Sequence, residues 1–272
     1  PYIARLMAGP LKPKRPVLGI DFAGRVEAVG SNFGLFQPGD DLFGISFVNG
    51  SFAEYLCVPA SEIQMAKIPI NTTYEAAAAI PYAGFTALVC LRNLGGIQPG
   101  QTVLINGASG GVGTHAVQMA KSFGAEVTGV CSSRNLDMVR SIGADQVVDY
   151  TQVDFTDLGR QYDLIFDVVR KRTFSECKKA LKPEGIYITT EVSPSLMLQK
   201  KWVGITNRQK LEYLPLMRPD KQIMLDLQHM LETGIVTPVI DRRYKLSEVP
   251  QALAYLGEGH ARGKVIINLE QD

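Results

Sequence analysis

The sequence contains little cysteine, and the cysteines that it has are far apart. There are 4 among 272 residues, and Cys57, Cys90, Cys131 and Cys177 form no Cys-x-x-Cys pair. A disulfide framework or a structural zinc cluster needs cysteines at short, regular spacings. We therefore expect reduced thiols in an intracellular protein.

Long apolar runs and an excess of one charge are also absent. No apolar run approaches the roughly 20 residues that span a bilayer, and the first residues, PYIARLMAG, do not resemble a signal peptide. The 28 Lys and Arg residues nearly balance the 27 Asp and Glu residues, so no charge excess attracts nucleic acid or an anionic membrane. We expect a cytoplasmic protein with a small-molecule partner. Because the first residue is not Met, we expect the chain to begin within a longer protein.

The residues that are abundant are hydrophobic, at 46% of the chain, which is enough for a conventional core. Over the first eighty residues they form short β-type runs, at 19–30 and 51–59, with a Gly, Pro and Asp turn at 37–44. Frequent turns between short strands predict an antiparallel, barrel-like unit.

From about residue 84 apolar runs alternate with segments of helical periodicity. This alternation predicts an α/β fold with a doubly wound parallel sheet. After Pro215 a helical stretch leads to VTPVIDRRY and a last strand, and this segment is expected to return to the first unit. The predicted strands are 102–106, 126–131, 146–150, 163–169, 185–190 and 264–269.

A glycine-rich loop, NGASGGVG at 106–113, lies between a predicted strand and a predicted helix. Gly107, Gly110 and Gly113 are three residues apart, and Ala108 takes the place of the first glycine of the strict G-x-G-x-x-G pattern. Small residues permit a tight turn and close approach of a pyrophosphate to the start of the helix. The loop therefore predicts a dinucleotide site.

The second strand of this unit lacks the acidic residue that usually follows it. An Asp or Glu about 20 residues after the loop normally binds the ribose hydroxyls of NAD. Here the strand ends in Cys131, Ser132, Ser133, Arg134 and Asn135. Hydroxyl groups and a guanidinium donate hydrogen bonds to a 2′-phosphate, whereas a carboxylate repels it. We therefore expect NADP(H) as the cofactor, the alternative being that Arg134 only opens the next helix.

Several motifs together resemble the medium-chain dehydrogenase/reductase superfamily, in its zinc-independent NADPH:quinone oxidoreductase branch. They are LGIDFAGRVEAVG, PGDDLFG, GSFAEYLCVP, IPYAGFTALVCL, PGQTVLINGASGGVG, GADQVVDY and GHARGKVIINL. The resemblance implies a GroES-like β-barrel domain, here N-terminally incomplete, and a Rossmann domain. It assigns 1–83 to part of the barrel, 84–215 to the NADP(H)-binding domain, and 216–272 to a segment that completes the edge of the Rossmann sheet and returns to the barrel.

The resemblance also implies that no catalytic metal is bound. Zinc-dependent relatives have Gly-His-Glu where this chain has Gly19, Ile20 and Asp21, and their cysteine cluster is absent. The histidines, His115, His229 and His260, are scattered, and the first two are expected to be packing or surface residues.

Cofactor contacts are carried over from the family position by position. Ser109 to Val112 would face the pyrophosphate, and Ser132, Arg134 and Asn135 the 2′-phosphate. Thr86 and the strand end at Thr190 would approach the nicotinamide. The full set is Thr86, Ser109, Gly110, Gly111, Val112, Ser132, Arg134, Asn135, Tyr150, Asp167, Thr190, Val192, His260, Ala261 and Arg262.

One departure from the family follows the fourth strand. Relatives usually have a glycine pair there, but this chain has Arg170, Lys171 and Arg172 after Asp167, Val168 and Val169. These cations either add affinity for phosphate or form a solvated turn, and we favour the turn.

The expected reaction is transfer of hydride from NADPH to a quinone or to an α,β-unsaturated carbonyl compound such as an enone or alkenal. Hydride transfer requires correct stacking rather than a catalytic acid or base, so the lack of an obvious nucleophile is understandable. Either Tyr2 or a bound water is expected to stabilise the developing oxyanion. A non-catalytic NADPH-binding protein with a structural or regulatory role fits the same residues. Such folds commonly dimerise through the edge strands of the Rossmann sheet, so a homodimer is the expected assembly.

Overall fold

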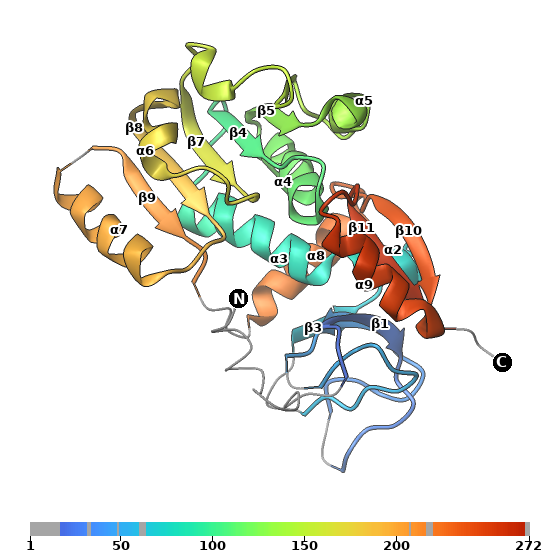
Figure 1. Ribbon diagram of the computed structural model, residues 1–272. Coiled ribbons are helices and arrows are strands. Elements are labelled where there is room, and N and C mark those ends of the chain that lie inside the picture. Colours follow the sequence, from blue (N-terminus) through green and yellow to red (C-terminus); the bar gives the residue numbers. More distant parts are fainter. Residues whose placement is uncertain are drawn as a thin grey trace.

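The computed structural model describes residues 17–31, 34–47, 49–59, 64–206, 208–215 and 220–269, with the side chain of residue 206 left out. The N-terminal part contains a three-stranded antiparallel sheet of β1 (Asp21–Arg25), β2 (Asp41–Ile45) and β3 (Gln64–Lys67). Phe43 and Ile45 of β2 are buried. This sheet lies at one end of the molecule in Figure 1.

The expected strand at 51–59 is wrong, because this segment consists of bends and irregular chain. Two backbone hydrogen bonds, from Ser51 to Gly19 O at 3.3 Å and from Phe52 to Leu18 O at 2.9 Å, attach it near β1. Further along, Tyr55 is 77% exposed. Alternating apolar residues alone do not form a strand when no neighbouring ladder continues alongside them.

Two short helices connect this sheet to the larger one. The Thr73 hydroxyl caps α2 (Tyr74–Ala79), and Pro81 opens α3 (Pro81–Leu88), where its missing N–H is tolerated. The chain continues directly into a π-helix, η2 (Val89–Leu94). Almost every residue of α3 is buried, which shows that α3 is a core helix rather than a surface helix.

The larger sheet has six parallel strands in the order β6-β5-β4-β7-β8-β9. This order confirms the doubly wound parallel sheet, with the switch of winding direction between β4 and β7. Three strands agree closely with the expected ranges, whereas β8 starts four residues early. The strands are β4 (Thr102–Asn106), β5 (Glu126–Cys131), β6 (Gln146–Asp149), β7 (Tyr162–Asp167), β8 (Leu181–Thr189) and β9 (Lys210–Tyr213).

Helices pack on the sheet as the alternating pattern predicts, and α7 lies beside the edge strand β9 (Figure 1). The helix after the glycine loop begins at Gly111, as the periodicity indicates. The helices and helical turns of this part are α4 (Gly111–Ser122), η3 (Ser133–Asn135), α5 (Leu136–Ser141), η4 (Phe155–Asp157), α6 (Phe174–Cys177), η5 (Lys178–Ala180), α7 (Pro194–Thr206) and α8 (Lys221–Glu232).

The C-terminal segment forms a sheet of its own. Strands β10 (Ile240–Lys245) and β11 (Lys264–Asn268) pair in parallel, connected by η6 (Leu246–Glu248) and α9 (Val249–Gly257). Within the described residues neither strand pairs with an edge of the six-stranded sheet, so the expected extension of that edge differs from the structure. Instead, Gly263 just before β11 forms a bridge with Gly110 and donates to Ser109 O, so this segment meets the glycine loop rather than the edge of the sheet.

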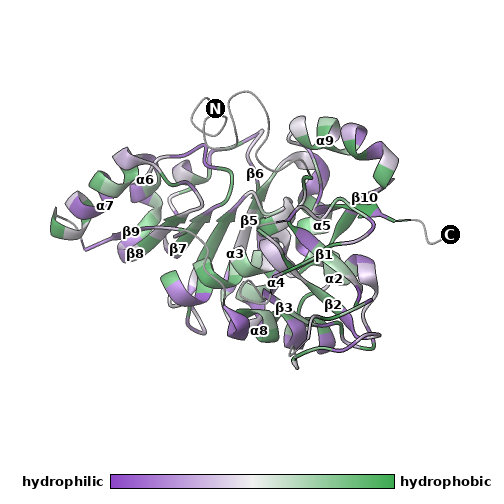
Figure 2. Cartoon of the chain, turned by 90° about the horizontal axis from the view of Figure 1, so that it is seen from below, coloured by the Kyte–Doolittle hydropathy of each residue, from purple (hydrophilic) through white to green (hydrophobic). Residues whose placement is uncertain are grey.

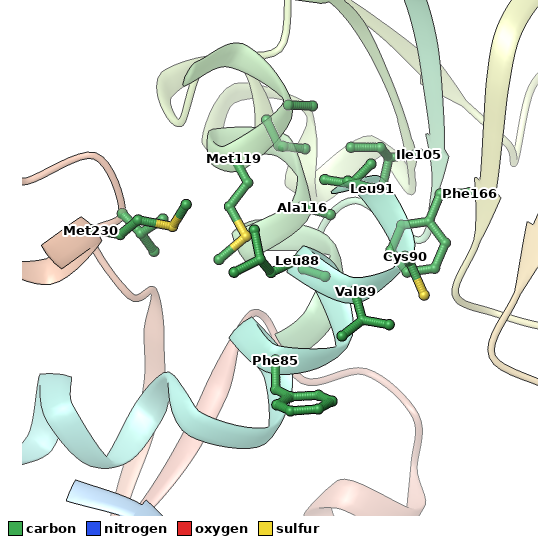
Figure 3. Packing of buried hydrophobic residues seen from close by; sticks show 14 of the residues in the cluster. Phe85, Leu88, Val89, Cys90, Leu91, Ile105, Ala116, Met119, Phe166 and Met230 are labelled. Carbon is green, nitrogen blue, oxygen red and sulfur yellow. The ribbon is translucent and has the colours of Figure 1, made fainter. Parts of the chain in front are cut away.

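The main core lies where α3 and η2 pass between the six-stranded sheet and the N-terminal sheet. Phe85, Leu88 and Leu91 pack together with Ala116 and Met119 of α4 (Figure 3). The strands and the helix faces turned toward them are the most hydrophobic parts in Figure 2. This packing fixes the position of α4, and with it the glycine loop at the start of the helix.

Candidate functional site

The glycine loop has the backbone geometry of a phosphate cradle. Gly107 leaves β4 with a φ of +91°, a conformation that favours glycine. A Cβ atom on Gly113 would lie only 2.0 Å from Gly107 O, so the loop and the first turn of α4 touch backbone to backbone. On β5, a Cβ on Gly129 would lie 2.5 Å from Val139 Cγ1. Gly107 and Gly113 therefore permit the contact between the loop and α4, and Gly129 permits α5 and the loop residue Ala108 to approach β5.

The N-terminus of α4 fits an anionic group. Gly110 occupies the N-cap position, and no side chain caps the helix there. The first backbone N–H groups of a helix have no partner within the helix and carry a partial positive charge. The amide of Gly110 donates to Gly107 O at 3.1 Å, whereas Gly111 and Val112 are partly buried residues of the first turn, whose amides lack a carbonyl partner within the helix. The donors present thus suit the pyrophosphate of a dinucleotide.

Hydrogen bonds connect the loop to the end of β5. Asn135 Nδ2 donates to Ser109 Oγ at 3.1 Å and to Ser132 Oγ at 3.2 Å. Asn135 is buried, and its Oδ1 atom has no hydrogen-bond partner within the described residues. The structure therefore brings together three of the predicted contacts, and Asn135 orients both serines.

The C-terminal segment closes over the same place. Gly263 N donates to Ser109 O at 2.9 Å, and Arg134 Nη2 donates to His260 O at 2.9 Å. Arg262 N donates to Asp241 Oδ2 at 2.9 Å, and Ala261 is partly buried beside it. Residues more than a hundred positions apart thus meet at the loop, as the family resemblance implies. Arg134 remains exposed, with a guanidinium available to a ligand.

An acidic residue that the sequence reasoning missed lies close to this cluster. Asp149 ends β6 directly beside Cys131 of β5, and it accepts hydrogen bonds from the hydroxyls of Ser133 and Thr151. These bonds, that of Ser133 first, hold the pKa of Asp149 below its ordinary value. Ser133 is consequently bonded to Asp149, whereas Ser132 Oγ accepts from Asn135 and Arg134 donates to His260 O. Tyr150 follows Asp149 and is 59% exposed.

The side chain of Asp167 is fully buried and satisfied within the protein. Its Oδ1 accepts bonds from Asn106 Nδ2 at 2.9 Å and from the backbone N–H of Arg170 at 3.1 Å. Its Oδ2 lies 2.9 Å from the hydroxyl of Tyr187. Burial, followed by the charge of Asp167, raises the pKa of Tyr187. Asp167 therefore connects the end of β4 to the segment after β7 at the switch point, through hydrogen bonds in the protein interior.

The cationic segment after β7 consists of bends and irregular chain. Arg172 pairs with Asp154 at 2.7 Å and with Glu176 at 3.8 Å, while Arg170 and Lys171 are exposed. Arg170 has a φ of +59°, the left-handed conformation that glycine adopts without strain. The backbone at Arg170 therefore has a conformation that suits glycine, at the place where the family resemblance implies a glycine pair.

The remaining predicted contacts are more widely spread. Thr190 follows β8 at the same sheet edge, and Val192 beyond it is 46% exposed. Thr86 is buried in α3, and its hydroxyl has no hydrogen-bond partner within the described residues. Tyr2 lies outside the described residues.

His115 is buried rather than ligand-facing. Its Nδ1 atom lies 2.6 Å from Gly111 O, so the neutral ring donates that hydrogen bond. Loss of solvation lowers the pKa of His115 to about 4. The Nε2 atom is enclosed and has no partner within the described part of the chain. The expectation that His115 is a packing residue agrees with this position.

No group of three or more His, Cys, Asp or Glu side chains is placed to hold a metal ion in the described parts of the chain. Asp21, at the position of glutamate in the zinc-dependent motif, instead pairs with Lys264 at 2.8 Å. Sequence reasoning missed this contact, because no local pattern connects residues 243 positions apart.

Taken with the parallel sheet and its glycine loop, the small antiparallel sheet defines the two-part architecture of the alcohol dehydrogenase type. Residues 3–70 match the family described as alcohol dehydrogenase GroES-like domain, and residues 142–267 match the family described as zinc-binding dehydrogenase.

Individual proteins narrow this class. The chain is 31% identical over 284 residues to the mitochondrial NAD(P)H oxidoreductase RTN4IP1 of Mus musculus, covering 93% of this chain and 70% of that protein. It is 32% identical over 279 residues to the chloroplastic quinone-oxidoreductase QR1 of Triphysaria versicolor, covering 97% and 84%. The quinone oxidoreductase structure from Coxiella burnetii superposes with a TM-score of 0.87 at 27% identity, covering 99% and 84%. The chain belongs to the medium-chain dehydrogenase/reductase superfamily, in its quinone oxidoreductase branch. It is an oxidoreductase of a family that uses a nicotinamide cofactor.

The same relatives correct one expectation. The cytoplasmic location is wrong, since the relatives from Mus musculus and Triphysaria versicolor are named as mitochondrial and chloroplastic. Balanced charge and scattered cysteines do not specify a compartment. In the described residues, no helix is both long enough and apolar enough to cross a membrane.

Proposed function

We propose that this protein is an NADPH-dependent reductase that transfers hydride to a quinone without a metal ion. The observation that carries the proposal is the cluster at the glycine loop, where Ser109, Ser132 and Asn135 are joined by hydrogen bonds and Arg134 is held by His260 O. The names of the relatives support a quinone as the acceptor.

The preference for NADPH rests on the donors after β5. Ser132 and Arg134 offer a hydroxyl and a guanidinium at the place where NAD-preferring relatives present a carboxylate. The nearby carboxylate of Asp149 already accepts bonds from Ser133 and Thr151. Its acceptor capacity is therefore directed toward the protein, and Arg134 remains the exposed charge.

In this proposal the protein binds and orients rather than acting as an acid or base. When bound, NADPH supplies the hydride, and the reduced acceptor takes its proton from water. The amides at the start of α4 hold the pyrophosphate, and the cluster around Asn135 holds the adenosine end. Residues near Thr86 and Thr190 would then face the nicotinamide. Asp167 acts indirectly, by fixing the loop beside Gly107.

The residue ranges 1–83, 84–215 and 216–272 remain the proposed units of the protein. The third range contributes to the cofactor site through His260 to Gly263, because these residues bond to Arg134 and Ser109. A site assembled from two distant parts of the chain explains why the loop alone did not indicate its full set of partners.

A steady-state assay tests the proposal. Purified protein is mixed with NADPH or NADH and with a quinone, an enone or an alkenal in separate reactions. Oxidation of the cofactor is followed by the loss of the absorbance of the reduced nicotinamide. We expect oxidation of NADPH with the quinone and a lower kcat/KM with NADH. Turnover of the enone or alkenal alone would support the alternative reductase. Saturable NADPH binding without turnover of any acceptor would support a non-catalytic protein.

We also propose a homodimer formed at the β9 edge of the sheet. Beside β9, α7 exposes a stripe of Leu198, Trp202 and Ile205, which are 69%, 69% and 82% exposed. If two copies of β9 pair antiparallel about Leu211, Lys210 of each lies opposite Glu212 of the other, so the edge is complementary to itself. Both features lie on the same side of the molecule.

The assembly is tested by light scattering after size-exclusion chromatography. We expect a dimer for the wild-type protein and a monomer for Ile205→Glu. Leu256→Glu on α9, where the side chain is 45% exposed, is the matched control and should remain dimeric. A wild-type monomer at all concentrations tested would contradict this proposal.

A further inference from the structure

The ion pair between Asp21 and Lys264 joins the two parts of the molecule at the glycine loop. Lys264 Nζ lies 2.8 Å from Asp21 Oδ2, with the side chains only 20% and 16% exposed. The other carboxylate oxygen, Oδ1, accepts the backbone N–H of Tyr82 at 2.9 Å. One carboxylate therefore holds the first turn of α3 and the start of β11 at the same time.

The other end of Lys264 lies against the loop. A Cβ atom on Gly111 would lie 3.1 Å from Lys264 Cδ, so the lysine stem covers the first residue of α4. The preceding residue, Gly263, bonds to Ser109 O and forms a bridge with Gly110. Lys264 therefore begins at the loop, passes over Gly111 and ends in the N-terminal sheet.

The backbone on both sides of the ion pair is held in place by its surroundings. Gly263 has a φ of +85°, and a Cβ atom on it would lie 2.2 Å from Val239 O. The backbone just before Lys264 is therefore fixed by close packing that does not depend on the ion pair. Asp21 is fixed by strand pairing opposite Ile45.

We propose that Lys264 is a positioning residue, which through Asp21 fixes the glycine loop relative to α3 and the N-terminal sheet. This inference rests on the proposed binding of NADPH at the loop. The ion pair then keeps the distance between the amides at the start of α4 and Thr86 of α3 constant. A ligand that contacts both places requires this constant distance. Loss of the pair leaves each part folded but loosens the spacing.

A simple local charge would behave differently. If Lys264 only attracted phosphate through its positive charge, Asp21→Asn would release that charge and tighten NADPH binding. If the pair positions the loop, Asp21→Asn and Lys264→Met weaken binding alike. The direction of the Asp21→Asn effect therefore separates the two roles.

The test measures NADPH dissociation constants by fluorescence titration, together with hydrogen–deuterium exchange of the cofactor-free protein. For Lys264→Met and Asp21→Asn we expect dissociation constants raised about five- to tenfold, and the double variant should equal either single one. Lys264→Arg should restore most of the affinity. In the cofactor-free variants, amides of the loop and of the first turn of α3 should exchange faster than in the wild type.

Lys182→Met is the matched control, since Lys182 pairs with Asp163 at 2.7 Å at the opposite end of the sheet. It should change neither readout. Tighter binding in Asp21→Asn, multiplicative effects in the double variant, or unchanged exchange at the loop would overturn the proposal. If the wild-type protein binds no NADPH, the proposed function fails, whereas the exchange measurement still tests the role of the pair in the cofactor-free protein.

Discussion

Asn106 and Asp167 are joined by a buried hydrogen bond of 2.9 Å between the ends of two neighbouring parallel strands. The bond crosses the point where the sheet changes its winding direction, directly below the glycine loop. The side-chain amide of Asn106 and the backbone N–H of Arg170, which follows β7, both donate to Oδ1 of Asp167. The floor of the site is therefore a satisfied polar network rather than an open set of ligand groups.

Replacing Asp167 tests this network. We expect Asp167→Ala to lower the free energy of unfolding by about 3 kcal/mol, because several buried donors lose their acceptor. Asp167→Asn keeps an oxygen for Asn106 and Arg170 and should lose less. Urea unfolding gives the two values. NADPH affinity of Asp167→Asn should stay within about twofold of the wild type, and a large loss there would indicate direct contact with the cofactor.

Arg134 should determine the choice of cofactor. Removing the guanidinium with Arg134→Ala should weaken NADPH binding by roughly 1.5–3 kcal/mol, about ten- to a hundredfold, while NADH binding changes little. Dissociation constants for both cofactors provide the measurement. Arg140→Ala removes a surface cation that pairs with Asp137 on α5 and serves as the control. Equal losses for the two cofactors would contradict recognition of a 2′-phosphate.

Arg170 adopts a backbone conformation that suits glycine better. We expect Arg170→Gly to raise the free energy of unfolding by up to about 1 kcal/mol, since relief of the left-handed strain exceeds the greater freedom of glycine in the unfolded chain. Lys171→Gly changes a neighbour outside that conformation and should lower stability or leave it unchanged. Urea unfolding compares the variants. A less stable Arg170→Gly would show that the arginine side chain contributes packing that outweighs the strain.

The buried His115 should make stability fall in mild acid. Its pKa is lowered to about 4 from an ordinary value of 6.5. Between these values the unfolded chain binds the proton and the folded protein does not, so stability present above pH 6.5 is lost as the pH falls toward 4. The contribution is roughly 3 kcal/mol.

Unfolding curves between pH 7 and 4 measure this loss. His115→Asn keeps an N–H donor for Gly111 O but cannot titrate, so its stability should depend less steeply on pH despite a lower starting value. His229→Asn changes an exposed histidine on α8 and should keep the wild-type slope. Parallel curves for wild type and His115→Asn would contradict the buried neutral ring.

Much of the six-stranded sheet was predictable because buried parallel strands and their helices leave strong periodic patterns. Strands β4 and β5 and the start of α4 follow those patterns closely. The segment 51–59 was not predictable, because its alternating residues depend on a neighbouring strand to form a ladder. The local sequence contains the periodic pattern of a strand or helix, but it does not show whether a neighbouring strand is present.

For the site, the sequence predicted the loop and the cluster of Ser109, Ser132, Arg134 and Asn135. It did not predict the bond between Asp149 and Ser133, nor the pair of Asp21 and Lys264, since both depend on how separate elements meet. The conformation of Arg170 was also hidden, although the missing glycine pair marked the place. Long-range contacts were accessible only through the family resemblance, whose motif GHARGKVIINL contains Lys264 but whose carried-over cofactor contacts included His260 and not Lys264.

The bond from Gly263 to Ser109 has a consequence for the order of synthesis. Because β11 follows the loop by about 150 residues in the chain, the ribosome must complete residues 260–264 before the loop acquires its last partners. A nascent chain in which only the parallel sheet has left the ribosome therefore has a glycine loop without its C-terminal partners. Premature termination before β11 would yield a protein with much of its core but without the bond that joins the C-terminal segment to the glycine loop.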